Sequence, residues 1–525
     1  QCRINQNAAT ARTEWSEAAD ESPDREIRGR GRCFKTRFVM KVWVNTPVID
    51  DDRVFFSWRQ SEPNPFQRAN EFSFRYENID LRGFSTYVFY EVFLALQLRI
   101  FVSAQEPVEL HFPEPVPARA VEFWRAFHGA SNVEIGPILD IESYEPRIAA
   151  TRHETRKVAI FYGGGKDSML ATGMLTELFG DDQVVLIQYV APVNPSPGTL
   201  AMHERRQERH MLNPIRNLRG VATQRVFTDY VSNLNEEGLK HRPHRQLYTA
   251  GALPALLAWG TEYSSFGDTR TDFAILEDQN GDRNYKYSGS RPEIIGPQST
   301  YYQRVLRFDH KLQNVNFAFS TTQDHVLLIE RYPELLPATV PCTNGNSSER
   351  FCHRCYKCMF WAVTGLSAGF VDPNIDYDRI LTENQWTLRI VDHAKTGVEL
   401  TYYGNAEWVE GLLKVPIIYQ PICHAFSKID PDLLNGRIGY QARTNLYIMM
   451  ALLGNTHFPN QEVVAQEIFD FVGGDVMPKI ATLASEHQPI VAKLPEPWIY
   501  SNREAVIDYQ TRMPTRLDGL SFLHD

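Results

Sequence analysis

The hydrophobic pattern of the first 150 residues separates a polar segment from a folded one. Residues 1–33 are polar, with mixed charge and little periodicity, so we expect a flexible tail, with a docking arm as the alternative. Aromatic and β-branched residues alternate or run together over 34–44 and 53–60, which is typical of strands. A buried helix running into a strand is expected over 87–102. We therefore predict an N-terminal α+β domain over residues 34–150.

From residue 157 the pattern changes to short apolar runs that alternate with helical stripes. Apolar runs predict strands at 157–162, 184–190, 221–231 and 263–269, the last of them ending in Gly-Asp. Between them, apolar residues recur at helical spacing over 169–180, 206–220 and 247–260. Strands that alternate with helices predict a parallel sheet covered on both faces, and right-handed crossovers would make it doubly wound.

The last third of the chain reads as mainly helical. An apolar helix is expected over 359–370, and further helix-like segments occupy 406–414, 443–454 and 460–473. We assign residues 151–370 to an α/β core and residues 371–525 to a helical C-terminal region, which could cap the sheet or supply a surface for a homodimer.

Composition and charge narrow the class of protein. The 525 residues include 43% hydrophobic and 22% charged side chains, which excludes a mainly disordered or fibrous chain. The net charge of −10 disfavours a nucleic-acid partner. We expect no membrane span and no secretory signal, since residues 1–32 have no apolar core. Seven cysteines, four of them within 342–358, suit a metal site in a reducing compartment, hence a cytoplasmic location.

A glycine-rich loop carries the sharpest chemical signal. Gly163, Gly164 and Gly165, followed by Lys166, Asp167 and Ser168, stand between a predicted strand and a predicted helix. Glycines let backbone N–H groups approach an anion, and the helix N-terminus adds further donors. Lys166 can supply charge to a phosphate, Ser168 a hydrogen bond, and Asp167 a helix cap or a ligand for Mg²⁺. The alternative is a turn with incidental polar residues, since the loop matches neither the Walker A nor the dinucleotide pattern.

A second signal is a cluster of cysteines, for which structural zinc is the first choice. Cys342 is followed by Cys352, Cys355 and Cys358, a spacing suited to tetrahedral zinc. The alternatives are an iron–sulfur cluster, a redox or sulfur-carrying thiol, unrelated cysteines, or His353 in place of one cysteine. Cys2, Cys33 and Cys423 are interpreted as bystanders.

The loop resembles the SGGxDS loop of the PP-loop ATP pyrophosphatases, with Gly163 in place of the serine. This resemblance implies that the loop binds the pyrophosphate part of ATP and that AMP is transferred to a substrate oxygen. A PP-loop followed by a cysteine knuckle is similar to two families. The more similar is the epimerase of UDP-N-acetylmuramoyl-alanyl-glutamate, which also has an N-terminal domain. The other is 7-cyano-7-deazaguanine synthase.

The resemblance therefore implies an isomerase that adenylates the terminal L-glutamate of a peptide or UDP-muramoyl peptide in peptidoglycan biosynthesis. Adenylation removes the negative charge of the carboxylate, so that a modest base can take the α-proton. The expected cofactors are ATP, Mg²⁺ and Zn²⁺, with Lys166, Asp167 and Ser168 as catalytic residues. The alternatives are a tRNA-modifying adenylating enzyme and a nucleotide-binding protein without catalysis.

Other candidate residues carry weaker signals. Asp268 follows a predicted strand, where it could contact Mg²⁺ or ribose or simply begin a turn. Residues 281–311 are interpreted as a long loop near the site. Its possible anion ligands are Arg283, Lys286, Arg291 and Arg307. Asp309 and His310 are possible proton-abstracting bases.

Overall fold

A computed structural model describes most of the chain after residue 38. The described residues are 39–103, 106–146, 155–191, 197–270, 275–277, 283–285, 291–341, 349–396, 420–454, 458–495, 499–501, 517 and 519–524. The predicted tail lies outside them. The chain divides into Gln1–Phe38 and Val39–Asp525, and the second unit is described here.

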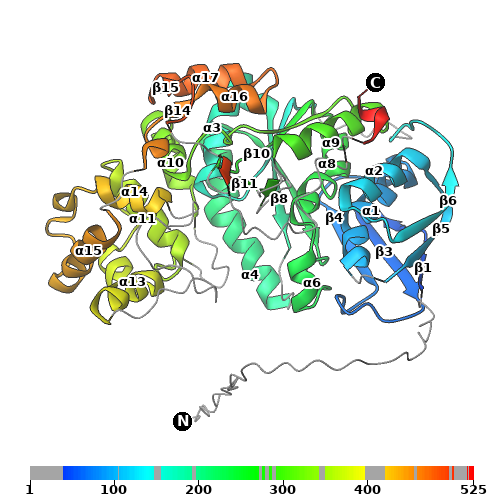
Figure 1. The fold of residues 1–525 in the computed structure, drawn as a ribbon, viewed down its shortest axis with the longest axis horizontal. Helices are drawn as coiled ribbons and strands as arrows, with labels where there is room; N and C mark the ends of the chain where they lie inside the picture. The colour runs from blue at the N-terminus through cyan, green and yellow to red at the C-terminus, as the bar shows by residue number, and fades with distance from the viewer. Residues whose placement is uncertain are drawn as a thin grey trace, which may run out of the picture. The chain divides into compact units, whose positions relative to one another are not determined.

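The described part is an α/β protein built around one large sheet (Figure 1). Eleven strands of the described residues join in the order β13-β10-β7-β8-β9-β4-β3-β1-β5-β6, with β2 beside β3. The strands of this sheet are β1 Met40–Val44, β2 Val48–Asp50, β3 Arg53–Gln60, β4 Glu71–Tyr76, β5 Val108–Pro117, β6 Val133–Leu139, β7 Val158–Phe161, β8 Val184–Val190, β9 Ala222–Thr228, β10 Tyr263–Phe266 and β13 Lys311–Asn314.

The N-terminal half of the sheet is covered on one face by two helices. These are α1 Thr86–Ser103 and α2 Ala118–His128. Strand β3 alternates buried and solvent-facing residues, as one covered face requires. The expected change from helix to strand within 87–102 is wrong, because α1 stays helical to Ser103. By length and composition α1 could span a membrane, but 83% of its apolar window is buried, as in a core helix.

The other half of the sheet is parallel and is covered on both faces. Strands β9, β8, β7, β10 and β13 are parallel neighbours. Val158 and Ile160 of β7 pack in one apolar cluster, while Ala159 and Phe161 pack in the other. The helices of this half are α3 Lys166–Phe179, α4 Pro197–Gln207, α5 Asn213–Arg219, α6 Glu236–His241, α7 His244–Thr249, α8 Leu253–Trp259, α9 Pro292–Arg304 and α10 Thr321–Arg331. The single helix predicted over 247–260 is two helices, α7 and α8.

The two halves share one continuous sheet through an antiparallel pair. Strand β4 pairs with β9, with Phe74 opposite Thr228. This pairing joins residues of the predicted N-terminal domain to the predicted core, although the exact domain boundaries stay a prediction.

The C-terminal third is mainly helical in its described residues. Its helices are α11 Tyr356–Ser367, α12 Tyr377–Thr382, α13 Gln385–Thr396, α14 Gln420–Lys428, α15 Tyr440–Leu453, α16 Gln466–Val472 and α17 Met477–Ser485. Short strands also occur there and in the core, namely β11 Ile275–Glu277, β12 Arg283–Tyr285, β14 Val464–Ala465, β15 Ile490–Val491 and β16 Ile499–Ser501. Ile390 and Leu446 belong to the same apolar cluster as β7 and α3, so these helices extend the core. The predicted segment 406–414 lies outside the described residues.

Candidate functional site

The glycine loop lies where the strand order of the parallel sheet reverses. The chain passes from β7 to β8 and β9 on one side, and then returns to β10 and β13 on the other side. Ligands of such sheets bind beyond the carboxyl ends of the strands at this reversal. Strand β7 ends at Phe161, Gly163–Gly165 follow, and α3 begins at Lys166, three residues before the expected start of the helix. The order of strand, loop and helix is as the sequence predicts.

The loop has a shape that glycine favours. Gly164 has φ +71°, and a Cβ there would lie 2.8 Å from Met211 Cγ. At Gly163 and Gly165 an added Cβ would meet nothing within 4 Å, so their surroundings are open. The backbone N–H of Gly163 donates to Ser168 Oγ at 3.3 Å, and this hydroxyl donates to the Gly165 carbonyl at 3.1 Å. Ser168 therefore closes the loop on itself.

The end of the neighbouring strand β10 touches the loop. A Cβ on Gly267 would lie 2.6 Å from the Asp167 carbonyl oxygen, so this close approach requires glycine. The next residue, Asp268, accepts a hydrogen bond from Arg245 Nη2 of α7 at 2.7 Å. Asp268 thus lies at the predicted edge of the sheet, but in an ion pair that the sequence did not indicate.

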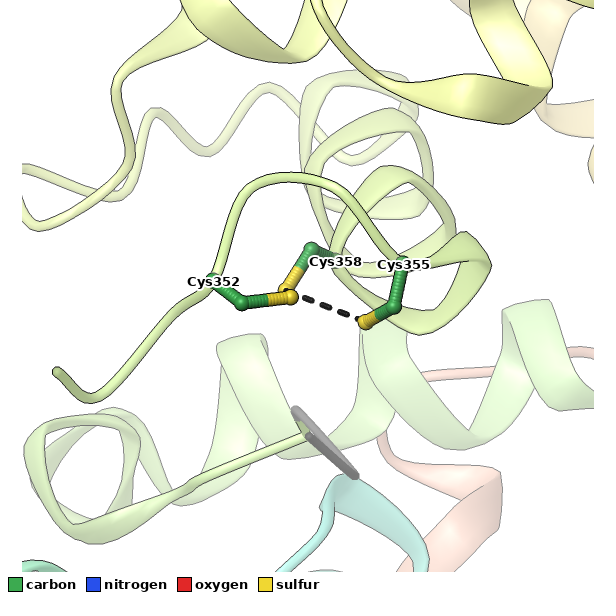
Figure 2. A group of neighbouring side chains, drawn as sticks. All are labelled: Cys352, Cys355 and Cys358. Atoms are coloured by element: carbon green, nitrogen blue, oxygen red, sulfur yellow. Dashed lines mark hydrogen bonds between the residues drawn. The ribbon is translucent and has the colours of Figure 1, made fainter. Parts of the chain in front are cut away.

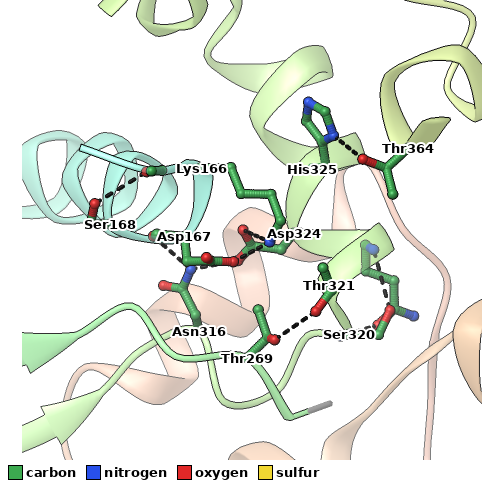
Figure 3. Close-up of polar contacts among 12 residues, drawn as sticks. Lys166, Asp167, Ser168, Thr269, Asn316, Ser320, Thr321, Asp324, His325 and Thr364 are labelled. Atoms are coloured by element: carbon green, nitrogen blue, oxygen red, sulfur yellow. Dashed lines mark hydrogen bonds and ion pairs between the residues drawn. The ribbon is translucent and has the colours of Figure 1, made fainter. Parts of the chain in front are cut away.

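A buried carboxylate from a distant segment completes the polar cluster (Figure 3). Lys166 Nζ contacts Asp167 Oδ1 and lies 3.4 Å from Asp324 Oδ2. Asp324 stands in the first turn of α10 and has no solvent exposure, whereas the Asp167 side chain is 37% exposed. The charges therefore run from a buried end at Asp324 to an open end at Asp167.

Asn316 ties this cluster together from the segment after β13. Its side-chain Nδ2 donates to the Asp167 carbonyl oxygen at 2.9 Å and to Asp324 Oδ1. Burial raises the pKa of Asp324 well above its usual range, and the neighbouring Asp167 adds to this shift, while Lys166 and Asn316 oppose it. Strand ends and helix starts that are far apart in sequence thus meet around Lys166.

The next residue of α10 connects the cluster to α11. His325 is fully buried, and its Nδ1 lies 2.5 Å from Thr364 Oγ1. Its ring is 4.1 Å from the Trp361 ring, measured between centroids. Burial, followed by the charge of Lys166, lowers the pKa of His325 well below its usual value.

Three of the four predicted metal ligands come together in the structure (Figure 2). The sulfur of Cys358 is 3.9 Å from that of Cys352 and 3.5 Å from that of Cys355. With Zn–S bonds of about 2.3 Å, two sulfurs of a tetrahedral site are about 3.8 Å apart. The three thiols could therefore hold a metal ion, and their spacing fits zinc. Cys342, the fourth predicted ligand, lies outside the described residues.

Neither His353 nor Cys423 joins the three thiols. His353 Nε2 accepts a hydrogen bond from the Asp376 backbone N–H at 3.0 Å, and His353 is not among the grouped ligands. Cys423 is buried on α14, and burial raises its thiol pKa to about 12. It is separate from the cluster of three cysteines.

The predicted loop over 281–311 is largely wrong, because it contains β12 and α9. His310 is buried, with Nε2 2.8 Å from Ser264 Oγ and Nδ1 2.8 Å from the Thr261 carbonyl oxygen. Such contacts give this histidine a structural role. Arg291 is fully buried beside Glu293, and Arg307 donates to Ser143.

Three further candidates of segment 281–311 remain, namely Arg283, Lys286 and Asp309. Asp309 accepts a hydrogen bond from Gln303, Arg283 lies in β12, and Lys286 lies outside the described residues. Sequence reasoning missed Asp324, Asn316 and Arg245. A capping box at Ser320 and Gln323 marks the start of α10, but it gives no sign that the next residue would face Lys166.

Comparisons with protein-family models, with curated proteins and with solved structures found no match to this chain.

Proposed function

We propose that this protein binds ATP with Mg²⁺ at the glycine loop and adenylates a substrate carboxylate, releasing pyrophosphate. The observation that carries the proposal is the position of Gly163–Ser168 at the reversal of strand order, with Lys166 at the start of α3. In this proposal the parallel half is a PP-loop core, and the open surroundings of Gly163 and Gly165 leave room for phosphate oxygens.

The residues of the loop have distinct roles in this proposal. Backbone N–H groups of the loop and of the first turn of α3 bind the departing pyrophosphate, and Lys166 offsets its charge. Asp167 is the more exposed of the two carboxylates, so it is the one that a ligand can reach from solvent. It would hold Mg²⁺, which neutralises phosphate charge when bound.

The acceptor that we propose is the terminal L-glutamate of a peptide or UDP-muramoyl peptide, which is then epimerised. The combination of this loop with a cysteine knuckle supports that choice, since the resemblance rests on both. The three thiols would hold a structural zinc ion away from the chemistry. These features, with sparse cysteines elsewhere, also support a cytoplasmic location.

The test is ATP-dependent release of AMP and pyrophosphate by the purified full chain. UDP-muramoyl-alanyl-glutamate is offered in one arm, and 7-carboxy-7-deazaguanine with ammonia in another. We expect AMP only with the glutamyl substrate, together with conversion of L- to D-glutamate. AMP only with the deazaguanine would move the chain to the nitrile-forming class. Binding of ATP without AMP release from either would leave a nucleotide-binding protein or another acceptor, such as tRNA.

Two lysines of one strand–helix unit supply matched variants for this test. Lys166→Met removes the charge at the loop, whereas Lys157→Met removes an exposed charge at the opposite end of β7. We expect release of AMP to fall at least 100-fold in Lys166→Met, because the pyrophosphate loses a buried charge partner. Equal activity of the two variants would contradict the role given to the loop.

A further inference from the structure

We infer that binding of a metal at the cysteine cluster and binding of pyrophosphate at the glycine loop are thermodynamically coupled. The inference rests on the proposed function, because it assumes that the loop binds phosphate. The cluster is Cys352, Cys355 and Cys358. Two separate sets of contacts connect it to the loop, and neither was expected from the sequence.

The first connection runs through the backbone before the knuckle. Arg350, two residues before Cys352, donates from Nε to the Thr339 carbonyl oxygen at 2.8 Å and from Nη2 to the Leu336 carbonyl oxygen. Val340, which follows Thr339 in the chain, donates its backbone N–H to the Gly164 carbonyl oxygen at 2.6 Å. The Arg350 side chain is thus hydrogen-bonded to segment 336–340, and this segment is hydrogen-bonded to the glycine loop.

The loop has little freedom to compensate if this connection loosens. Gly164 is the residue with φ +71°, and it packs closely against Met211. Val340 is 2% exposed and shares an apolar cluster with Cys352 and Cys358. Movement of the knuckle would therefore shift Val340 and, with it, the hydrogen bond to the Gly164 carbonyl oxygen.

The second connection runs through α11, which begins directly at the knuckle. Cys355 is the N-cap of this helix, and Cys358 lies in its first turn. Thr364 of the same helix contacts His325, and the Trp361 ring lies against the His325 ring, with 4.1 Å between centroids. The neighbouring Asp324 contacts Lys166, so α11 sets the position of α10 against the loop.

A metal would tighten both connections at once. It ties Cys352 of the incoming segment to Cys355 and Cys358 of α11, and it replaces protons on the thiols. Since coupling between two sites is reciprocal, pyrophosphate must raise metal affinity by the same factor by which metal raises pyrophosphate affinity. We expect a factor of about ten, which is common for coupled sites.

The experiment measures the dissociation constant of inorganic pyrophosphate, with excess Mg²⁺, by calorimetry. The full chain is used loaded with zinc and, after removal of zinc and chelator, without it. Circular dichroism establishes that the zinc-free protein is folded. We expect about tenfold weaker binding without zinc. Equal binding by the two folded forms overturns the coupling alone, whereas no binding by the zinc-loaded protein overturns the proposed function and the coupling with it.

Two arginines of the knuckle supply the variants. Arg350→Met removes both hydrogen bonds to the segment before the knuckle but no cysteine, so the zinc-loaded variant should bind pyrophosphate about tenfold more weakly. Arg354→Met removes an exposed charge that lies 3.7 Å from Glu383 and should leave binding unchanged. If the zinc-free wild type unfolds, these zinc-loaded variants decide the matter. Wild-type affinity in Arg350→Met would overturn the first connection, through Arg350 and Val340.

Discussion

Glu91 and Asp324 are both buried carboxylates, but the two halves of the sheet surround them differently. Glu91 of α1 accepts hydrogen bonds from Trp124, from Tyr144 at 2.9 Å and from Tyr301 at 2.5 Å. Asp324 instead faces Lys166 at the edge of the sheet where the parallel strands β7, β10 and β13 end. Three neutral donors enclosed in a core stabilise the fold, whereas a buried acid beside a lysine and a half-exposed acid is an arrangement suited to binding.

The sheet itself differs in the same way. In the N-terminal half one face carries α1 and α2 and the other carries polar and charged side chains, such as Lys41 and Glu109. In the parallel half both faces are covered, so β8 is buried along its whole length. The polar cluster around Lys166 lies beyond the ends of these strands.

The largest effect is expected for Glu91→Ala. The substitution leaves three buried donors without an acceptor, so the free energy of unfolding should fall by about 3–5 kcal/mol, measured by chemical denaturation. Pyrophosphate affinity should stay at the wild-type value. Glu122→Ala on α2, a half-exposed residue paired with Arg119, should cost under about 1 kcal/mol. Weaker pyrophosphate binding by Glu91→Ala would contradict the assignment of a structural role to Glu91 and a binding role to Asp324.

The second effect concerns the dependence of stability on pH. Burial raises the pKa of Glu91 from 4.5 to about 7, against the opposing hydrogen bonds. Between these values the folded protein binds the proton that the unfolded chain has lost, so this group's contribution falls as pH rises and is constant above about 7. Over this interval the contribution of Glu91 to the free energy of unfolding falls by about 3 kcal/mol.

Glu91→Gln removes the titrating group and is the matched variant for that prediction. Denaturation at pH 5 and pH 8 should show that the wild type loses more stability over this interval than Glu91→Gln does. An identical loss in the two proteins would show that Glu91 stays ionised throughout.

A smaller effect is expected at the contact between β10 and the loop. In Gly267→Ala the new methyl group would meet the backbone of Asp167 and push the loop aside. We expect pyrophosphate affinity to fall about tenfold, or about 1.4 kcal/mol. Gly163→Ala is the matched variant, because its methyl group meets nothing within 4 Å. It should keep the free energy of unfolding to within about 0.5 kcal/mol, and a comparable loss of stability in both variants would argue against a specific contact.

The smallest effect is expected on the open face of the N-terminal half. Glu109 lies 3.1 Å from Lys41, and the hydrogen bond from Lys41 lowers the pKa of Glu109. Because solvent screens this exposed pair, Glu109→Gln should leave the melting temperature unchanged. A clear decrease would mean that this face is more enclosed than the structure indicates.

Much of the parallel half could be predicted because its signals are local. The apolar runs at β7, β8 and β10 and the glycines after β7 lie within short stretches, and the structure has each of them as expected. Regular spacing also predicted α3 and α15. The interpretation of the loop as a phosphate site, and of Asp268 as part of it, stays a prediction.

The rest depends on contacts between residues far apart in sequence. Asp324 is 158 positions from Lys166, and Asn316 is 149 positions from Asp167. No local pattern shows that the starts of α3 and α10 face each other. The same holds for the pairing of β4 with β9, since strand order is decided by packing across the whole sheet. Within 281–311, glycines and charges resembled a loop, whereas burial of Tyr301 and Tyr302 makes α9 part of the core.

A crystal structure of the protein with Mg²⁺ and a non-hydrolysable ATP analogue would show whether the glycine loop binds phosphate. We expect the β- and γ-phosphates to lie within hydrogen-bond distance of backbone N–H groups of Gly163–Ser168, with Lys166 Nζ turned toward them. Nucleotide bound elsewhere, or a loop still closed by Ser168 with no phosphate beside it at saturating analogue, would contradict this expectation.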